Sequence, residues 1–478
     1  MQYETVIGLE VHAQLLTESK IFCGCSTRFG APPNSHTCPI CLGMPGVLPT
    51  LNKKAVTLAV RMGIACGCAI RPEGRFARKN YFYPDLPKGY QISMYEAPIA
   101  TGGGVEIVVN GQRKKIGLTR IHMEEDAGKA IHNEIEGIGL IDLNRAGVPL
   151  IEIVSEPDIR NSDEAAAYLK KLRELLIYTG VSDGDMEKGN FRCDANISLR
   201  PVGQTSFGTR AEIKNLNSFR FIQKALEYEI TRQSRLLNEG GKITQETRLW
   251  DTKKGVTLPM RNKEEAHDYR YFPEPDLVPI QIGQVWIDQI MADMPELADA
   301  KRERFMTQYQ IPEYDAVILT SSTRLADFYE RVIALYPKPK TASNWIMGEL
   351  LKELNRENKE IDEALIRPEQ LVALLTLIDN GAISGKIGKI VFEEVYRSGE
   401  DPEKIILDKG LKQVSDESAI ERVIEEVLAA HPDEFLEFRS GKEKLFGFFV
   451  GQVMKRSGGQ AHPEKVNQLL KKRLTLIN

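Results

Sequence analysis

The sequence has no apolar run that approaches membrane-spanning length, although it contains 478 residues. Its N-terminus, MQYETVIGLE, lacks the basic segment followed by an apolar one that a secretory signal peptide requires. Neither the phosphate-binding loop GxxxxGK[ST] nor the zinc-protease motif HExxH occurs anywhere. The net charge is only −4, so overall charge does not indicate a nucleic acid or a membrane as partner. These absences predict a soluble cytoplasmic protein and exclude a P-loop nucleotide site.

The chain is longer than a single hydrophobic core usually supports, so two or three domains are expected. Its hydrophobic fraction of 42% is typical of a globular protein with a large buried core. Seven cysteines are present. In a reducing compartment, cysteines are expected to be free thiols or metal ligands and not disulfides.

Residues 5–15, TVIGLEVHAQL, alternate apolar and polar side chains. This period of two predicts a strand with one buried face. Glu10 and His12 are neighbours on the polar face, where a carboxylate and an imidazole can hold a cation. Taken alone, such a pair is also compatible with an ordinary solvated face.

The same alternation recurs later in the chain, which favours the cation-binding interpretation. Its polar positions are Arg192, Asp194 and Asn196 in residues 191–200, Arg210, Glu212 and Lys214 in residues 209–216, Arg120, His122, Glu124 and Asp126 in residues 120–126, and Glu152 in LIEIV. Glu125 falls on the opposite face from Glu124 unless a bulge intervenes. Because an antiparallel sheet commonly has one dry and one wet face, these side chains are expected to converge if the wet face is concave.

Two close pairs of cysteines flank a polar loop. The pairs are Cys23 with Cys25 and Cys38 with Cys41. Four thiolates in this spacing can bind zinc tetrahedrally, and a complete four-sulfur shell leaves no open catalytic position, so a structural zinc is expected. His36 is a reserve ligand. The remaining cysteines, Cys66, Cys68 and Cys193, are expected to be small buried residues, although the first two could compete for the metal.

Lys79, Tyr81 and Tyr83 alternate outward just before a turn that is rich in proline and glycine. A lysine flanked by tyrosines can meet a phosphate or a base. The alternative is an exposed lysine beside interfacial tyrosines.

Helical periodicity predicts helices at residues 53–63, 163–178 and 218–238, which are expected to pack behind the sheet. After Met291 strand alternation nearly disappears. The sequence therefore predicts an α+β protein in three domains. These are a large cradle of mixed, mainly antiparallel sheet at residues 1–290, a helical domain at residues 291–400 and a small helical tail domain at residues 401–478.

The last 38 residues, from Gly441, hold eight basic and two acidic residues, a local charge of +6. Such a basic island suits a phosphate backbone, although lysine-rich helices are also common solvated surfaces. The segment SGGQAHPEK adds paired glycines and Pro463, a flexible link whose amides can approach RNA phosphates.

Six separated blocks carry a resemblance that covers essentially the whole chain. They are VIGLEVH, KNYFYPDLPKGYQIS, HMEEDAGK, IDLNRAGVPLIEI, EIKNLNS and NWIMGEL. The chain thereby resembles the B subunits of the bacterial tRNA-dependent amidotransferases. That resemblance implies ATP-dependent conversion of mischarged Glu-tRNA(Gln), and often Asp-tRNA(Asn), to the amide form. ATP phosphorylates the side-chain carboxylate of the aminoacyl group, and ammonia from a glutaminase A subunit displaces the phosphate, while a small C subunit ties A and B together.

The resemblance also implies roles for particular residues. The expected magnesium ligands are Glu10, His12, Glu125 and Glu152, with Glu124 as the neighbour that alternation alone prefers. The groups expected to hold ATP or acyl-phosphate oxygens are Lys79, Lys214 and Arg192, with Tyr81 and Tyr83 beside the nucleotide. Asp194, Asn196 and Glu212 are expected to complete the metal shell or guide ammonia. The four paired cysteines would hold a structural zinc, and the expected tRNA contacts are Lys442, Lys444, Lys455, Arg456 and Lys465.

Two other functions stay open at this point. One is a non-catalytic, zinc-stapled subunit that only docks aminoacyl-tRNA for another chain. The other is a metal-dependent hydrolase of phosphate esters, which the lack of HExxH and of a P-loop makes less favourable.

Overall fold

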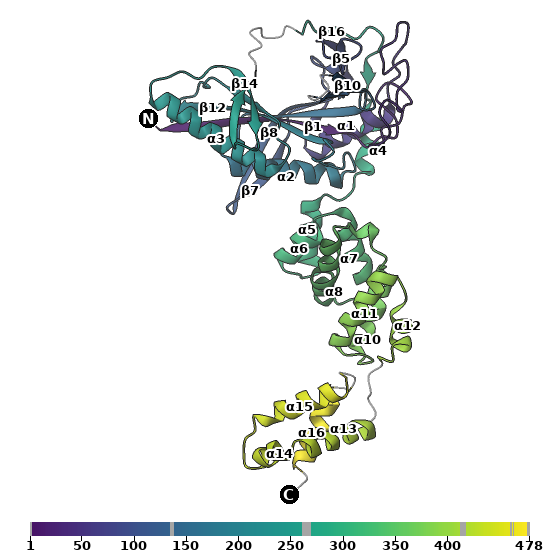
Figure 1. Cartoon of the computed structure of the whole chain (residues 1–478). Helices are drawn as coiled ribbons and strands as arrows, with labels where there is room; N and C mark the ends of the chain where they lie inside the picture. The colour runs from purple at the N-terminus through teal and green to yellow at the C-terminus, as the bar shows by residue number, and fades with distance from the viewer. Residues whose placement is uncertain are drawn as a thin grey trace. The chain divides into compact units, whose positions relative to one another are not determined.

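The computed structural model of the chain describes residues 2–133, 138–260, 269–411, 417–458, 461 and 463–475. The internal contacts divide the chain into two units, Met1–Ala298 and Asp299–Asn478 (Figure 1). Among the described residues, every named strand lies in the first unit, and the named elements of the second unit are helices. The α+β class predicted from the sequence is confirmed.

Thirteen of the described strands form one sheet in the first unit, with the order β15-β14-β13-β12-β1-β11-β8-β5-β4-β16 along its main path. These strands are β15 (Val256–Pro259), β14 (Glu246–Asp251), β13 (Ala211–Lys214), β12 (Phe191–Pro201), β1 (Tyr3–Gln14), β11 (Pro149–Ser155), β8 (Gln112–Glu125), β5 (Tyr90–Met94), β4 (Phe76–Asn80) and β16 (Phe272–Pro273). Neighbours along the path are antiparallel, except that β13 and β14 are parallel.

Shorter strands complete the first unit. The branches of the large sheet are β2 (Ala69–Ile70), β6 (Ala100–Thr101) and β7 (Gly104–Val109), and the separate two-stranded pairs are β9 (Lys129–Asn133) with β10 (Ile138–Asp142) and β3 (Glu73–Gly74) with β17 (Ile280–Gln281). The sheet is therefore mixed but mainly antiparallel, as predicted.

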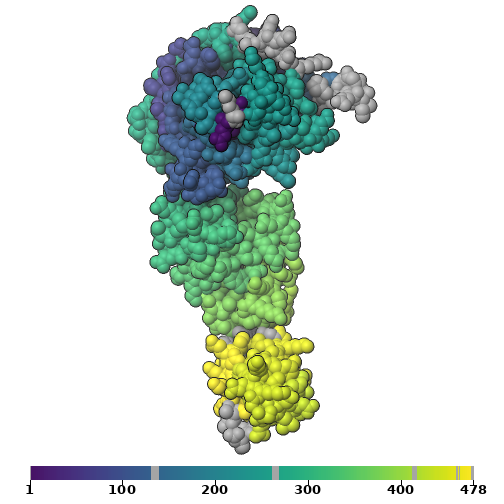
Figure 2. All heavy atoms as spheres, turned by 90° about the vertical axis from the view of Figure 1, so that its left-hand side faces the viewer, coloured from purple at the N-terminus to yellow at the C-terminus, as the bar shows by residue number. Residues whose placement is uncertain are grey.

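β1 is an inner strand of the large sheet, and it pairs with β11 on one side and with β12 on the other. Its alternation appears as predicted, because Ile7, Leu9 and Val11 are each 0% exposed while Glu10 and His12 are partly exposed on the other face. In Figure 2 the purple atoms of the N-terminal end are surrounded by blue and teal atoms from residues far along the chain. β1 therefore pairs with strands from distant parts of the chain, and its polar side chains lie near the middle of the sheet's polar face.

Helices cover the apolar face of the sheet. Leu169 of α2 (Ser162–Tyr178) and Ile222 of α3 (Phe219–Asn238) belong to the same buried core as Leu9, and both helices lie along one face in Figure 1. Each begins at a side-chain cap: Asn161 accepts a hydrogen bond from the Glu164 amide, and Ser218 accepts one from the Phe221 amide. The opposite, polar face of the sheet carries the groups that the sequence singled out.

The other helices of the first unit are α1 (Lys53–Ala65) and α4 (Gln284–Ala292), which contact each other. Asn52 caps α1 by accepting hydrogen bonds from the amides of Lys54 and Ala55. The predicted helix starts and ends are thus confirmed to within two residues for α1, α2 and α3.

The second unit holds two separate hydrophobic cores. One spans residues from Phe305 to Ile406 and the other spans residues from Ile420 to Leu474. The helices around the first are α5 (Ala298–Gln308), α6 (Glu313–Leu319), α7 (Thr323–Leu335), α8 (Pro339–Trp345), the π-helix η1 (Ile346–Leu350), α9 (Leu351–Glu357), the 3-10 helix η2 (Ile361–Glu363), α10 (Pro368–Asp379), α11 (Gly385–Ser398) and α12 (Pro402–Asp408). Those around the second are α13 (Glu417–Ala430), α14 (Pro432–Arg439), α15 (Leu445–Arg456) and α16 (Pro463–Thr475). In the part of the chain that the structure describes, no helix combines the length and the apolarity needed to cross a bilayer.

Candidate active site and metal centres

Strand register places three ionisable side chains side by side on the polar face of the sheet. His12 of β1 is opposite Glu152 of β11, and Glu152 is opposite His122 of β8. His12 Nε2 lies 3.3 Å from Glu152 Oε2 and 3.6 Å from Glu124 Oε1. His12, Glu124 and Glu152 can each direct one ligand atom so that the three atoms lie within 4.8 Å of one another. We refer to these three residues as the His12 cluster.

His122 extends the cluster on its β8 side. Its Nε2 is 3.4 Å from Glu152 Oε2, and the side chain is only 3% exposed. Its Nδ1 is buried without a hydrogen-bond partner among the described residues. Alternation predicted His122 on the polar face, but the expected magnesium ligands did not include it; the parity that it shares with Glu124 was the available signal.

The charges of the His12 cluster are strongly coupled. Burial disfavours the imidazolium, but the hydrogen bond and charge of Glu152, with the charge of Glu124, outweigh this effect and raise the pKa of His12 to about 9. Burial by itself would raise the pKa of Glu152. The charges and hydrogen bonds of His122 and His12 outweigh this effect and hold the pKa of that carboxyl well below its usual range. The cluster therefore consists of an imidazolium held by carboxylates at neutral pH in the absence of another cation.

The structure brings Glu124 into the cluster and directs Glu125 to the other face. Glu125 Oε2 accepts a hydrogen bond from Lys88 Nζ at 2.6 Å, and Glu125 Oε1 accepts one from the Ile92 amide at 2.9 Å. The reason is that consecutive strand residues point to opposite faces and β8 continues through Glu125 without a bulge at this point. Of the two neighbours weighed from the sequence, Glu124 is the one that lies beside His12 and Glu152.

A second group of charges surrounds Glu10 on the β12 side. Asn196 Nδ2 donates to Glu10 Oε1 at 2.9 Å, and Lys214 Nζ donates to Asp194 Oδ2 at 2.7 Å and lies 3.0 Å from Glu212 Oε1. Burial, followed by the charges of Glu152, Glu212 and Asp194, raises the pKa of Glu10. An excess of negative charge thus remains at Glu10, which a bound cation would offset.

Arg192 marks the edge of this polar face next to His12, which it opposes across β1 and β12. Its guanidinium donates to Asp126 Oδ1 at 3.0 Å, and Asp126 Oδ2 accepts from Gln14 at 2.9 Å. The charge of Asp126 raises the pKa of Arg192, so the guanidinium stays cationic. Asp126 is 3% exposed and fixes Arg192, a role that the sequence pattern did not indicate.

Lys79 is not brought into the carboxylate clusters within the described residues. Its ammonium lies 4.9 Å from the ring centroid of Tyr269 and 5.9 Å from that of Tyr81. Tyr81 also makes an edge contact with Tyr83, with centroids 5.9 Å apart. Lys79, Tyr81 and Tyr83 therefore lie together, with the lysine ammonium against aromatic rings. Burial, followed by the charges of Glu124 and Glu125, raises the pKa of Tyr81.

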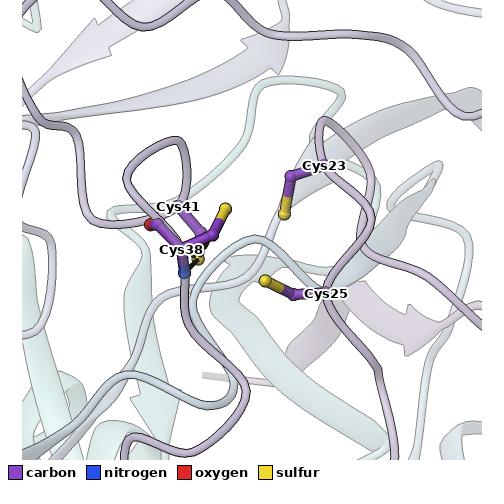
Figure 3. A group of neighbouring side chains, drawn as sticks. All are labelled: Cys23, Cys25, Cys38 and Cys41. Atoms are coloured by element: carbon purple, nitrogen blue, oxygen red, sulfur yellow. Dashed lines mark hydrogen bonds between the residues drawn. The ribbon is translucent and has the colours of Figure 1, made fainter.

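The four paired cysteines converge as predicted. Each can direct its sulfur so that all four sulfurs lie within 4.8 Å of one another, and Figure 3 shows Cys23 and Cys25 facing Cys38 and Cys41 across a gap. A hydrogen bond from Cys23 lowers the pKa of Cys41 to about 4, while burial raises the pKa of Cys25 to about 11. Four convergent sulfurs on two knuckles fit a tetrahedral zinc ion, which would hold all of them as thiolates. The other cysteines lie apart from this group.

The predicted tRNA contacts lie on the last helices. Lys444 directly precedes α15, Lys455 and Arg456 are in its last turn, and Lys465 is in α16. Arg456 Nε donates to Glu426 Oε2 of α13 at 2.8 Å, and Lys442 Nζ lies 3.0 Å from Glu437 Oε2. Part of the positive charge counted from the sequence is thus neutralised within the second unit.

Two family models match the chain. The GatB/GatE catalytic domain matches residues 5–288, and the GatB domain matches residues 327–474. Together these regions include the polar face of the sheet, the cysteine cluster and the basic helices. The chain belongs to the GatB family.

Relatives of this GatB-family chain match it from end to end. A protein of Geotalea uraniireducens is 59% identical over 99% of this chain and 100% of its own length, and one of Thermodesulfovibrio yellowstonii is 60% identical over 98% and 99%. Both are named as the B subunit of aspartyl/glutamyl-tRNA(Asn/Gln) amidotransferase. The resemblance noted from six sequence blocks is thereby confirmed.

Proposed function

We propose that this GatB-family chain uses ATP to activate the side-chain carboxylate of mischarged Glu-tRNA(Gln), and of Asp-tRNA(Asn), and then amidates it with ammonia. The observation that carries the proposal is the His12 cluster on the polar face of the sheet, in a chain whose relatives are named as the B subunit of an amidotransferase. The carboxylate oxygen attacks the γ-phosphorus of ATP and ADP leaves. Ammonia then attacks the acyl carbon, and the bond from that carbon to the phosphate oxygen breaks.

Phosphoryl transfer of this kind depends mainly on positioning and on neutralising the phosphate oxygens. The carboxylates of Glu124 and Glu152 and the imidazole of His12 are the donors that would hold Mg²⁺, with Glu10 facing the same polar surface. When bound, the ion would neutralise phosphate charge. Lys214, Arg192 and Lys79 are cations assigned to phosphate oxygens, and Asp194, Asn196 and Glu212 position Lys214 and Glu10.

Other parts of the chain have supporting roles in this proposal. Zinc held by the four paired cysteines stabilises the loop between them, and the basic helices contact tRNA. Ammonia comes from a glutaminase A subunit, with a small C subunit completing a cytoplasmic complex. The relatives are named as one subunit of an enzyme, which supports the need for further subunits.

The proposal is tested by assembling the chain with candidate A and C subunits and measuring ATP cleavage and Gln-tRNA formation from Glu-tRNA(Gln). The variants Glu10→Ala, His12→Ala and Glu124→Gln are expected to abolish tRNA-stimulated ATP cleavage while tRNA affinity stays near that of the wild type. A chain that only docks tRNA would show no effect of these variants on either readout. Turnover of phosphate esters by the isolated chain, without charged tRNA, would instead support the hydrolase.

A further inference from the structure

Lys20 is a lysine that the fold of the first unit buries completely. It is 0% exposed, whereas a lysine is almost never fully buried unless an acidic group pairs with it. Its Nζ donates to the Leu143 carbonyl at 3.3 Å, and among the described residues no carboxylate lies within ion-pairing distance of it. That carbonyl satisfies one of the three donors of the ammonium and leaves its charge unpaired. Because an unpaired buried charge is costly, a negative partner is expected nearby.

Lys20 lies between the two cysteine knuckles. Its amide donates to the Cys25 carbonyl at 2.9 Å, so its backbone is part of the first knuckle. Its side chain extends toward the second knuckle at Gly147, which has a left-handed backbone (φ 82°). A Cβ atom at this glycine would lie 3.6 Å from Lys20 Cδ and 3.7 Å from Cys41 Cβ. The side chains of Lys20 and Cys41 therefore flank the same backbone position.

A cavity of about 230 Å³ brings the same groups together, because its wall includes Lys20, Cys23 and Cys41. One sulfur ligand from each knuckle thus shares this space with the buried lysine. The carboxylates in the wall already have basic partners, which are Lys88 for Glu125 and Arg78 for Glu274 and Asp276. The sulfurs are therefore the groups in this wall that can supply negative charge to Lys20.

A zinc ion held by four thiolates needs positive charge around it. The thiolates carry twice the charge of the ion, so the complete centre is a dianion. Cys41 is only 7% exposed, and water offsets little of the negative charge at its sulfur. The hydrogen bond from Cys23 is the main influence that lowers the pKa of Cys41, and the positive charge of Lys20 also lowers it. The buried ammonium and the dianionic centre would thus each supply the charge that the other lacks.

We propose that Lys20 is a positioning residue of the zinc centre, whose buried ammonium offsets the charge of the thiolates and thereby retains the ion. The inference rests on the zinc centre of the proposed function. Groups just outside the ligands of a metal typically change its affinity by about 10–100-fold. When zinc leaves, the thiols take up protons and the ammonium loses its negative partner. Lys20 therefore stabilises the zinc-bound form and destabilises the zinc-free form.

The test measures the rate at which the full-length chain loses zinc to a chromogenic chelator, and its melting temperature with zinc and after zinc removal. Lys20→Met keeps a long side chain without the charge, and it is expected to lose zinc at least about tenfold faster than the wild type. After zinc removal, Lys20→Met should melt at or above the wild-type temperature, because an apolar group replaces an unpaired buried charge. A merely structural role would lower both melting temperatures equally.

Lys301→Met is the matched control. Lys301 is also buried, at 9% exposed, but it lies in the second unit and donates to Asp327 and Glu330. This variant should lose zinc at the wild-type rate. Lys20→Gln can still donate to the Leu143 carbonyl but lacks the charge, so it should lose zinc faster and decides the question if Lys20→Met does not fold.

Zinc loss at the wild-type rate from a folded Lys20 variant would overturn the inference, as would equal melting losses with and without zinc. Failure of both variants to fold would show a structural role and overturn it as well. Metal content of the purified wild type, measured by mass spectrometry, separates the two proposals. If the wild type holds zinc while Lys20→Met retains it normally, only the role of Lys20 fails; if the wild type binds no zinc, the zinc centre itself fails.

Discussion

His12 illustrates how the charge of a single residue is set by the carboxylates around it. Its imidazole is 20% exposed and lies within 3.6 Å of two carboxylates, so in the metal-free protein a proton supplies the positive charge between them. A divalent ion at this place must displace that proton, because imidazole binds a metal through a neutral nitrogen. The same residue therefore links the stability of the site to pH.

The stability of the metal-free protein is expected to fall between pH 6.5 and about 9 through His12. The pKa of His12 is about 9 in the folded protein, above the ordinary 6.5, so the stabilisation is complete below pH 6.5 and is lost as the pH rises through 9. The loss is at most about 3.4 kcal/mol, since one pKa unit corresponds to about 1.36 kcal/mol. Thermal unfolding in EDTA at pH 6 and pH 9.5 measures it.

His12→Asn is the control for this prediction, because it removes the titrating group and keeps a polar side chain. The difference in melting temperature between wild type and His12→Asn should shrink at the higher pH. Parallel pH curves for the two proteins would contradict the assigned cause.

The contrast between Glu124 and Glu125 shows what could and could not be predicted for single residues. Alternation within β8 correctly placed Glu124 on the polar face, because side-chain parity is a local property of a strand. The hydrogen bond that Lys88 donates to Glu125 was not predictable. The two residues are far apart in the chain, and the packing of the sheet brings them together. Such contacts depend on which distant strands pair, and the sequence pattern of one strand does not predict that pairing.

At the scale of elements, the loop between the two cysteine pairs is the feature that the proposed zinc ion would affect most. Its cysteine ends converge: the hydrogen bond from Cys23 lowers the pKa of Cys41, whereas burial raises the pKa of Cys25. A zinc ion bound here would hold every sulfur as a thiolate. Asn34 holds the middle of the loop, because it donates a hydrogen bond to the Ile141 carbonyl of β10 and accepts one from the Leu143 amide.

Cys38→Ser is expected to release the zinc and to unfold the loop locally, with a melting temperature several degrees below that of the wild type. Metal content by mass spectrometry and limited proteolysis of residues 26–37 check this outcome. Cys68→Ser is the matched control, because Cys68 is half-buried in the same unit but lies outside the cysteine cluster. Wild-type metal content and melting temperature in Cys38→Ser would refute a structural zinc.

The elements themselves were largely predictable. Helical periodicity placed α1, α2 and α3 correctly, and the structure adds a capping side chain at the start of each one. The strand expected at residues 209–216 is shorter in the structure, where β13 covers only Ala211–Lys214. Asn215, directly after it, has a left-handed backbone (φ 67°), which ends the extended conformation. The alternation of apolar and polar residues does not mark this end.

For the whole molecule, the charges that the sequence singled out fall into two groups, one in each unit. The His12 cluster, Glu10 and Lys214 all lie in the first unit, whereas the basic helices lie in the second. The sequence showed the excess of basic residues after Gly441, but not that acidic residues of α13 neutralise part of it. Glu425 pairs with Arg473, and Glu426 pairs with Arg456. Lys444 and Lys455 have no such acidic partner among the described residues.

Removing a basic residue that is free of acidic partners is therefore expected to affect tRNA binding without affecting the chemistry. Lys444→Gln and Lys455→Gln should each raise the KM for tRNA and lower the salt slope of binding by about one, while kcat at saturating tRNA stays at the wild-type value. Arg456→Gln is the internal comparison: because its guanidinium already pairs with Glu426, its loss should change the salt slope less. Binding of labelled tRNA to the assembled complex from 50 to 300 mM KCl measures these slopes. A larger effect of Arg456→Gln than of Lys455→Gln, or a fall in kcat for either lysine variant, would show that the basic helices do more than hold the phosphate backbone.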